Sequence, residues 1–62
     1  MTFYDLRNKI QMEAYLEILD ENGYLIHEGL NGTTMWEDRL LDTKVYLIVP
    51  GIVTKILLEV RE

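Results

Sequence analysis

The C-terminal third of the chain, TKVYLIVPGIVTKILLEV, alternates between two sets of side chains on either side of Pro50-Gly51. Because successive side chains of a strand point to opposite faces, this alternation predicts a β-hairpin that turns at Pro50-Gly51. Pro-Gly favours a type II turn, whose twist suits a two-residue hairpin loop poorly, so we expect a four-residue loop. One predicted face holds Val45, Leu47, Val49, Ile52, Ile56, Leu58 and Val60, broken by Thr54, and the other holds Lys44, Tyr46, Ile48, Val53, Lys55, Leu57 and Glu59.

The segment EILDENGYLIHEG predicts a second hairpin. Residues Asp20 to Gly23 fit a type I turn with a left-handed glycine, the usual three-residue loop with a bulge. This loop pairs Ile18 with Ile26 and Glu17 with His27, whereas a two-residue loop would oppose Ile18 to His27. We prefer the first register because it separates an apolar face from a mixed one. The apolar face collects Ala14, Leu16, Ile18, Tyr24 and Ile26, and the mixed face collects Tyr15, Glu17, Leu19, Leu25 and His27.

An N-terminal helix is predicted over the segment TFYDLRNKIQM. Thr2 can cap it, with Asp5 three positions later in a variant of the capping box. Phe3, Leu6 and Ile10 then fall on one helical face, which must dock on the rest of the protein because so short a helix is marginal alone.

A second short helix is predicted over residues 35–41, with Thr34 as its N-cap and Glu37 closing a capping box. The resulting order α-β-β-α-β-β indicates an α+β fold with antiparallel pairing throughout. The two hairpins would form one sheet, packed by the N-terminal helix and the short second helix. Residues 1–62 are too few for more than a single domain.

The residue types that most enzymes use are scarce. The chain has no Cys and no Ser, and His27 is its only imidazole. Asn22-Gly23 occur in the order of a turn, not in the order of a calcium-binding loop, and alternation sends Glu28 to the face opposite His27. Glu37 and Asp38 lie in the first turn of a predicted helix, where carboxylates favour the helix dipole. We therefore predict a protein that is not an enzyme and that binds no metal or cofactor.

Negative charge is concentrated in the middle of the chain, where residues 13–42 carry a net charge of −7. This distribution is typical of solvated turns and helix ends, and the alternative is a basic partner that docks on the middle third. The acids are Glu13, Glu17, Asp20, Glu21, Glu28, Glu37, Asp38 and Asp42, against Arg39 alone.

Surface contacts are the remaining candidates for function. Trp36 is of the residue type that anchors interfaces, although a single Trp in a small domain also serves as a core plug. Ile48, Val53 and Leu57 lie on the predicted outer face, so the N-terminal helix, Trp36 or a second copy of the chain must cover them. The candidate partner-contact residues are Trp36, Ile48, Val53, Leu57, Glu37 and Asp38.

Two alternative functions stay open. Lys44, Tyr46 and Lys55 share the outer face of the C-terminal hairpin, where cations beside an aromatic ring can bind a nucleic-acid strand. The acids of the middle third could instead mimic nucleic acid and block a host enzyme that binds it, which requires them to form one contiguous surface.

One set of turn and apolar positions runs through the middle of the chain: Asp20, Gly23, Leu25, Gly29, Leu40, Leu41, Asp42 and Val45. In these positions the chain resembles short uncharacterised reading frames in phages and integrative elements of Gram-positive bacteria. The resemblance implies a mobile-element accessory protein, and it implies no particular activity.

These patterns together predict a small acidic accessory module that acts by protein–protein contact or as a homodimer. Its N-terminus, MTFYDLRNKI, has no basic start followed by an apolar run and does not read as a signal peptide. The longest apolar region contains Pro, Gly, Thr and Lys and is too short to span a bilayer as a helix. We therefore expect a cytoplasmic protein.

Overall fold

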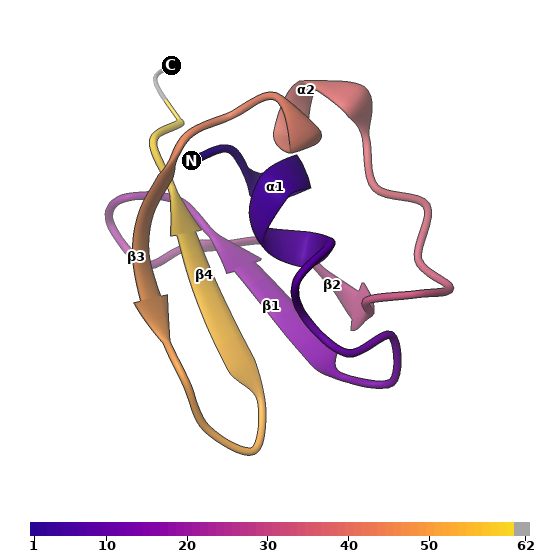
Figure 1. The fold of residues 1–62 in the computed structure, drawn as a ribbon. Helices are drawn as coiled ribbons and strands as arrows, with labels where there is room; N and C mark the ends of the chain where they lie inside the picture. The colour runs from indigo at the N-terminus through magenta and orange to yellow at the C-terminus, as the bar shows by residue number, and fades with distance from the viewer. Residues whose placement is uncertain (61–62) are drawn as a thin grey trace.

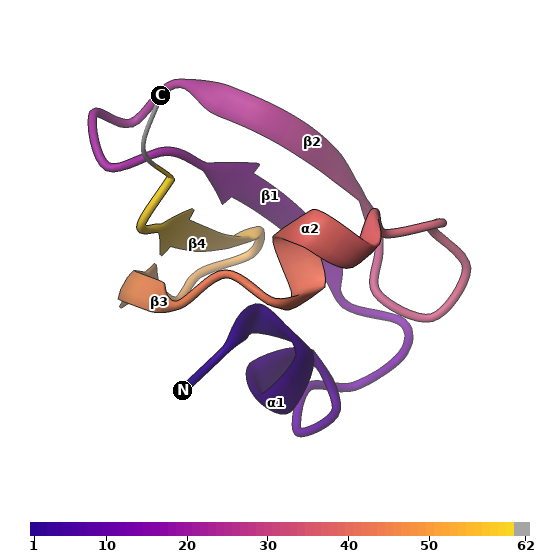
Figure 2. The same ribbon diagram turned by 90° about the horizontal axis from the view of Figure 1, so that it is seen from above.

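The computed structural model describes residues 1–60, which form a four-stranded mixed sheet with two short helices on one of its faces (Figure 1; Figure 2). The α+β class is confirmed. The elements are α1 (Phe3–Arg7), β1 (Tyr15–Leu19), β2 (Leu25–Leu30), α2 (Asp38–Leu41), β3 (Val45–Val49) and β4 (Thr54–Leu58).

The sheet has the strand order β2-β1-β4-β3, so the first and last strands lie side by side at its centre. The strands within each hairpin are antiparallel, but β1 and β4 are parallel, so the prediction of antiparallel pairing throughout is wrong. Alternation along a strand predicts its faces and not its neighbours. The parallel pairing of β1 with β4 joins the two most buried strands. It places Ile18 beside Ile56, and both side chains are fully buried.

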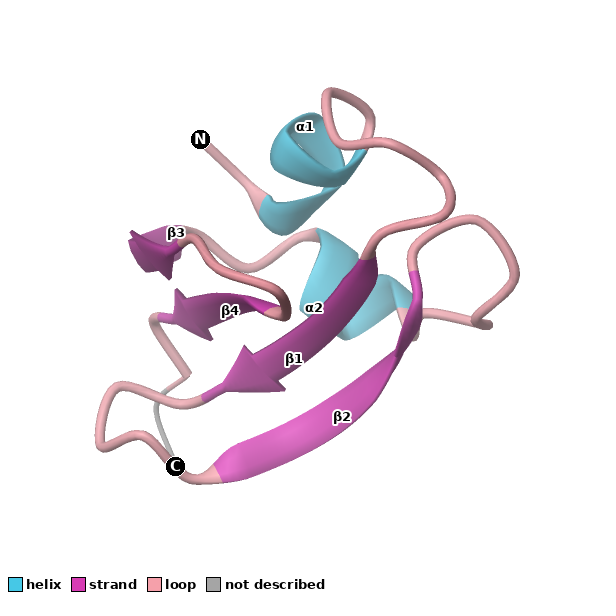
Figure 3. Cartoon of the chain, turned by 90° about the horizontal axis from the view of Figure 1, so that it is seen from below, coloured by secondary structure: helices cyan, strands magenta, loops and turns pink. Residues whose placement is uncertain are grey.

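The core lies between the helices and one face of the sheet, and Figure 3 shows both helices on that side. Strands β1 and β4 contribute their inward-facing residues, and α1, α2 and the loop before α2 contribute the rest. The core residues are Phe3, Leu6, Leu16, Ile18, Trp36, Leu40, Ile56 and Leu58.

Helix α1 begins as predicted. The Thr2 hydroxyl accepts a hydrogen bond from the Asp5 amide at 3.2 Å, and the Asp5 carboxylate accepts one from the Thr2 amide at 3.3 Å. The helix ends earlier than the pattern suggested. A longer helix would use the Arg7 carbonyl oxygen for the Gln11 amide, but this oxygen accepts a hydrogen bond from the Asn31 side chain at 2.8 Å.

Helix α2 begins three residues later than predicted, with Glu37 as its N-cap and no side-chain capping bond. Thr34 is therefore not the cap. The cause is Trp36, whose ring is buried and whose indole N–H donates to the Asn31 carbonyl oxygen at 3.1 Å. Holding Trp36 in the core keeps the preceding residues in a loop and delays the helix.

The turn between β1 and β2 matches the prediction. Gly23 has a φ of +89°, in the left-handed region that favours glycine. Its amide donates to the Asp20 carbonyl oxygen at 3.0 Å, and the Asp20 amide donates to the Tyr24 carbonyl oxygen at 2.9 Å. The Asp20 carboxylate also accepts from the amides of Asn22 and Tyr24, so its role here is to hold the turn.

Beyond the turn, a bulge at Ile26 shifts the register of β2. Ile18 pairs with His27, and Glu17 pairs with Glu28, so the predicted pairs Ile18–Ile26 and Glu17–His27 are both wrong. Ile26 and His27 both face the helices, because Ile26 packs against the core and His27 contacts the Trp36 ring. Glu28 consequently lies on the opposite face.

A second bulge, at Tyr46, changes the faces of β3. Val45 shares the core side with Leu58 as predicted, but the next pairs are Leu47 with Leu57, Ile48 with Ile56 and Val49 with Lys55. The β4 faces are therefore right, whereas Leu47, Ile48 and Val49 lie on the faces opposite to those predicted. The connection between β3 and β4 has the expected four residues, 50–53, and the pair nearest to it is Val49 with Lys55.

Candidate interaction surface

Four leucines form a row across the sheet face that the helices leave uncovered. Strand register places Leu25 of β2 beside Leu19 of β1, and Leu19 beside Leu57 of β4. Leu57 in turn pairs with Leu47 of β3. The outer two are about half exposed, at 53% for Leu25 and 50% for Leu47. We call this set the leucine row, and it spans the full width of the open face.

A charged row lies beside the leucine row, one step along the strands. It contains Glu28, Glu17 and Lys55, in that order across β2, β1 and β4. Like charges directly opposite one another on a sheet are destabilising, and Lys55, the neighbour of Glu17 on its other side, offsets part of the repulsion between Glu17 and Glu28. Among residues 1–60 the one ion pair within 4 Å joins Arg39 and Glu37, away from this face, so neither carboxylate has a partner at that distance.

Tyr15 and Leu30 pair with each other beyond the charged row and are 38% and 43% exposed. Partial desolvation, followed by the nearby carboxylates of Glu28 and Glu17, raises the pKa of Tyr15 above its usual value of 10.0. The phenol therefore stays protonated near neutral pH. The open face thus carries apolar and aromatic rows on both sides of one charged row.

Trp36 is a core residue and not a surface contact. Its side chain is 9% exposed, and its ring makes edge-to-face contacts with Phe3 at 5.2 Å and His27 at 5.3 Å between centroids. Of the two roles considered for Trp36, the structure places it in the core and not among the exposed partner contacts.

The other candidate partner contacts do not share one surface. Leu57 belongs to the leucine row, but Ile48 faces the helix side at the β3 edge and Val53 lies in the loop before β4. Glu37 and Asp38 are exposed at the start of α2, on the covered side of the sheet. Of the predicted set, Leu57 is the residue that strand pairing places on the open face.

Sequence reasoning missed how far the apolar face extends. Alternation placed Leu19 and Leu25 together on a mixed face and Leu57 on another, and it put Leu47 on the inner face. Joining the four required the β1–β4 pairing and the bulge at Tyr46, and neither leaves a signal in the alternation.

The three residues considered for nucleic-acid contact are spread along the second hairpin. Lys44 lies next to the pair Val45–Leu58, whereas Lys55 pairs with Val49 at the other end of the ladder. Four residue steps separate these ends, or about 13 Å. Tyr46 lies at the bulge near Lys44. The structure therefore forms no compact cationic patch from these residues.

The acids of the middle third also occupy separate places. Two lie on the open face, two in the β1–β2 turn, three around α2 and one before β1, so they do not meet the requirement of one contiguous acidic surface. In that order they are Glu17 and Glu28, Asp20 and Glu21, Glu37, Asp38 and Asp42, and Glu13.

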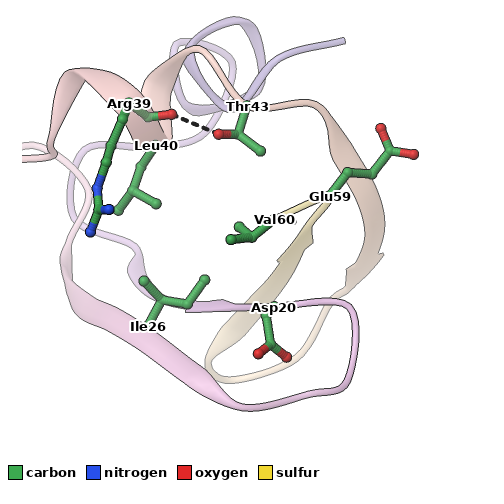
Figure 4. Close-up of a pocket in the computed structure, with 7 residues that line it drawn as sticks. All are labelled: Asp20, Ile26, Arg39, Leu40, Thr43, Glu59 and Val60. Atoms are coloured by element: carbon green, nitrogen blue, oxygen red, sulfur yellow. Dashed lines mark hydrogen bonds between the residues drawn. The ribbon is translucent and has the colours of Figure 1, made fainter. Parts of the chain in front are cut away.

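A pocket of about 510 Å³ opens between α2, the start of β2 and the end of β4 (Figure 4). Its apolar lining comes from Ile26, Leu40 and Val60. The polar groups around it are already engaged or turned outward: the Thr43 hydroxyl donates to the Arg39 carbonyl oxygen at 2.6 Å, and the Glu59 carboxylate extends away from the pocket in Figure 4.

Within the described part of the chain, no three His, Asp or Glu side chains gather where they could hold a metal ion. No helix among residues 1–60 is long and apolar enough to cross a membrane.

The fold and this surface define a small α+β domain with a mixed sheet that is covered on one face and open on the other. No protein-family model, curated protein or solved structure matches the chain. Its function is therefore inferred from its own residues.

Proposed function

We propose that this chain is a small acidic, non-catalytic accessory module that acts by protein–protein contact or self-association through its open sheet face. The leucine row is the observation that carries the proposal. A mobile-element origin, in line with the resemblance of its turn residues to phage and integrative-element proteins, and a cytoplasmic location belong to the same proposal.

Physical reasoning favours a partner on this face. A sheet face exposed to water normally carries polar residues on alternate positions. Here each of the four strands has a leucine on the open face, and the four leucines are neighbours across the sheet. Burying apolar surface is worth about 25 cal/mol per Å², and contiguous apolar patches larger than a few hundred Å² on a monomer mark interaction sites. Single exposed leucines would need no explanation, but an unbroken row across the sheet does.

Site-specific photo-crosslinking in the source cell tests the proposal. One form of the protein carries a photo-crosslinking residue in place of Leu47, at the end of the leucine row. The matched control carries it in place of Met35, which is 90% exposed in the loop before α2. We expect a protein adduct from position 47, none from position 35, and loss of the adduct when Leu25→Thr is added.

Threonine is chosen for that change because it keeps the preference for strand while removing apolar surface. An adduct with another protein and an adduct with the chain itself both support the proposed function. Absence of an adduct from position 47, or equal adducts from both positions, would contradict it.

A further inference from the structure

We infer that the open face binds a second copy of this chain, in a symmetric dimer whose two-fold axis runs parallel to the strands between β1 and β4. The inference rests on the proposed function and identifies the partner for the same surface. It follows from the positions of the leucine row and of the charged row on the sheet.

The leucine row suits this symmetry. Rotation about an axis between β1 and β4 exchanges the two halves of the sheet, so each leucine faces a leucine of the other copy. Leu19 lies over the partner's Leu57, and Leu25 lies over the partner's Leu47. The two sheets would stack in the aligned manner of a β-sandwich, about 10 Å apart.

The charged row selects this axis over others. Glu17 and Lys55 are adjacent on β1 and β4, on opposite sides of the axis. The same rotation therefore places Glu17 over the partner's Lys55, and Lys55 over the partner's Glu17. A two-fold axis perpendicular to the strands would also stack the leucines, but it would carry the charged rows to opposite ends of the interface. Of the two axes, the parallel one alone also places the partner's Lys55 over Glu17, in addition to the Lys55 that lies beside Glu17 in the same sheet.

The remaining charges do not oppose the dimer. Among the residues paired within the strands, Glu17 and Glu28 are the only acids. The acids of the turn and of α2 lie at the end of the sheet or on its covered side, so the open face has a net charge of about −1 on a chain of −5. Repulsion between two acidic copies at this face is therefore smaller than the charge of the whole chain would suggest.

The size of the face sets the expected strength. Four strands of about five residues cover about 19 by 17 Å in projection, which is less than the roughly 800 Å² that each partner buries in a standard interface. We therefore expect a weak dimer with a dissociation constant of about 10 to 100 μM. Sedimentation analysis should cover about 1 μM to 1 mM to include this range.

Charge reversal gives a sharp test. E17K places a cation opposite the partner's Lys55, and K55E places an acid opposite the partner's Glu17. Each dimer contains the clash twice, so each variant alone should raise the dissociation constant about tenfold or more. An equimolar mixture should restore association, because a heterodimer of the two variants faces opposite charges at both positions.

Matched controls make the same charge changes on the covered side. D42K alters α2 and K9E alters the turn after α1, both at exposed positions, and both should leave the dissociation constant within about twofold of wild type. Circular dichroism verifies that each variant folds. A second measurement needs no variant: NOEs between a labelled and an unlabelled copy should connect Leu19 methyls to the partner's Leu57.

The outcomes separate this inference from the proposed function. Weakening by both variants with recovery in the mixture, together with the intermolecular NOEs, supports the dimer. A strict monomer up to about 1 mM, unchanged dissociation constants, or failure of the mixture to recover overturns it. If the chain is monomeric but crosslinks another protein from position 47, the proposed function stands and the second copy is ruled out as the partner.

Discussion

Replacing Asn31 by alanine should remove a large part of the stability of this domain. Asn31 is fully buried in the loop after β2, and both polar atoms of its side chain are bonded. Its Nδ2 donates to the carbonyl oxygens of Arg7 at 2.8 Å, Ile10 at 3.1 Å and Gln11 at 3.3 Å, and its Oδ1 accepts from the Arg7 guanidinium at 3.1 Å. One side chain thus ties the end of α1 to the loop that leads into α2.

The magnitude follows from these bonds. Each intramolecular hydrogen bond contributes about 0.5–1.5 kcal/mol net, and a carbonyl oxygen left buried without a donor costs about 1–3 kcal/mol. Water can reach some of the freed groups, so we expect Asn31→Ala to lower the free energy of unfolding by about 3 kcal/mol. A domain of 62 residues has only about 3–9 kcal/mol in total. The melting temperature should fall by roughly 12–24 °C.

Urea denaturation followed by Trp36 fluorescence is a suitable assay, because the indole N–H itself bonds to the Asn31 carbonyl oxygen. Asn22→Ala is the matched control, since Asn22 is exposed in the β1–β2 turn and should cost less than about 1 kcal/mol. If Asn31→Ala were no less stable than Asn22→Ala, the role assigned to the buried amide would be refuted.

Three further changes have defined outcomes. Hydrogen bonds from the Thr2 backbone and hydroxyl to Asp5 hold the pKa of Asp5 below its usual 3.8. The contribution of Asp5 to stability is therefore complete above about pH 4 and is lost as the pH falls through the lower pKa of the folded state. NMR titration of Thr2→Ala should show this pKa rising, and an unchanged pKa would contradict the capping role. Gly23→Ala should cost about 1–2 kcal/mol in urea denaturation from backbone strain alone, because an added Cβ meets nothing within 4 Å, and a neutral result would disprove that account. Gly29→Ala should destabilise the domain by about 1–3 kcal/mol through overlap with the Thr34 side chain. Adding Thr34→Ala removes the nearest atom, so thermal melts should show partial recovery, and equal losses would argue against this contact.

Features set by a few neighbouring residues could be predicted from the sequence. The reciprocal bonds of Thr2 and Asp5 and the left-handed Gly23 after Asp20 are examples, because each depends on residues at most three positions apart. The inward faces of β1 and β4 were equally readable, since Leu16, Ile18, Ile56 and Leu58 are all fully buried.

Features set by tertiary contacts could not be predicted. Thr34 and Glu37 have the right spacing for a capping box, but burial of Trp36 outweighs it, and a side chain's burial cannot be read from spacing. Each bulge, at Ile26 and at Tyr46, adds one residue to its strand, so the residues that follow it point to the opposite face of the sheet from the one predicted. Leu57 was therefore correctly predicted on the outer face, whereas its neighbour Leu47 was predicted on the inner face and lies on the outer one.

The central position of β4 has a consequence for how the domain is made. A nascent chain presents α1, the β1–β2 hairpin, α2 and β3 before Thr54 is synthesised, yet β3 touches the rest of the sheet only through β4. Until that last strand inserts, β1 has an unpaired edge and the core lacks Ile56 and Leu58. A chain cut before Thr54 should therefore behave as an unassembled, aggregation-prone fragment, not as a smaller version of the domain.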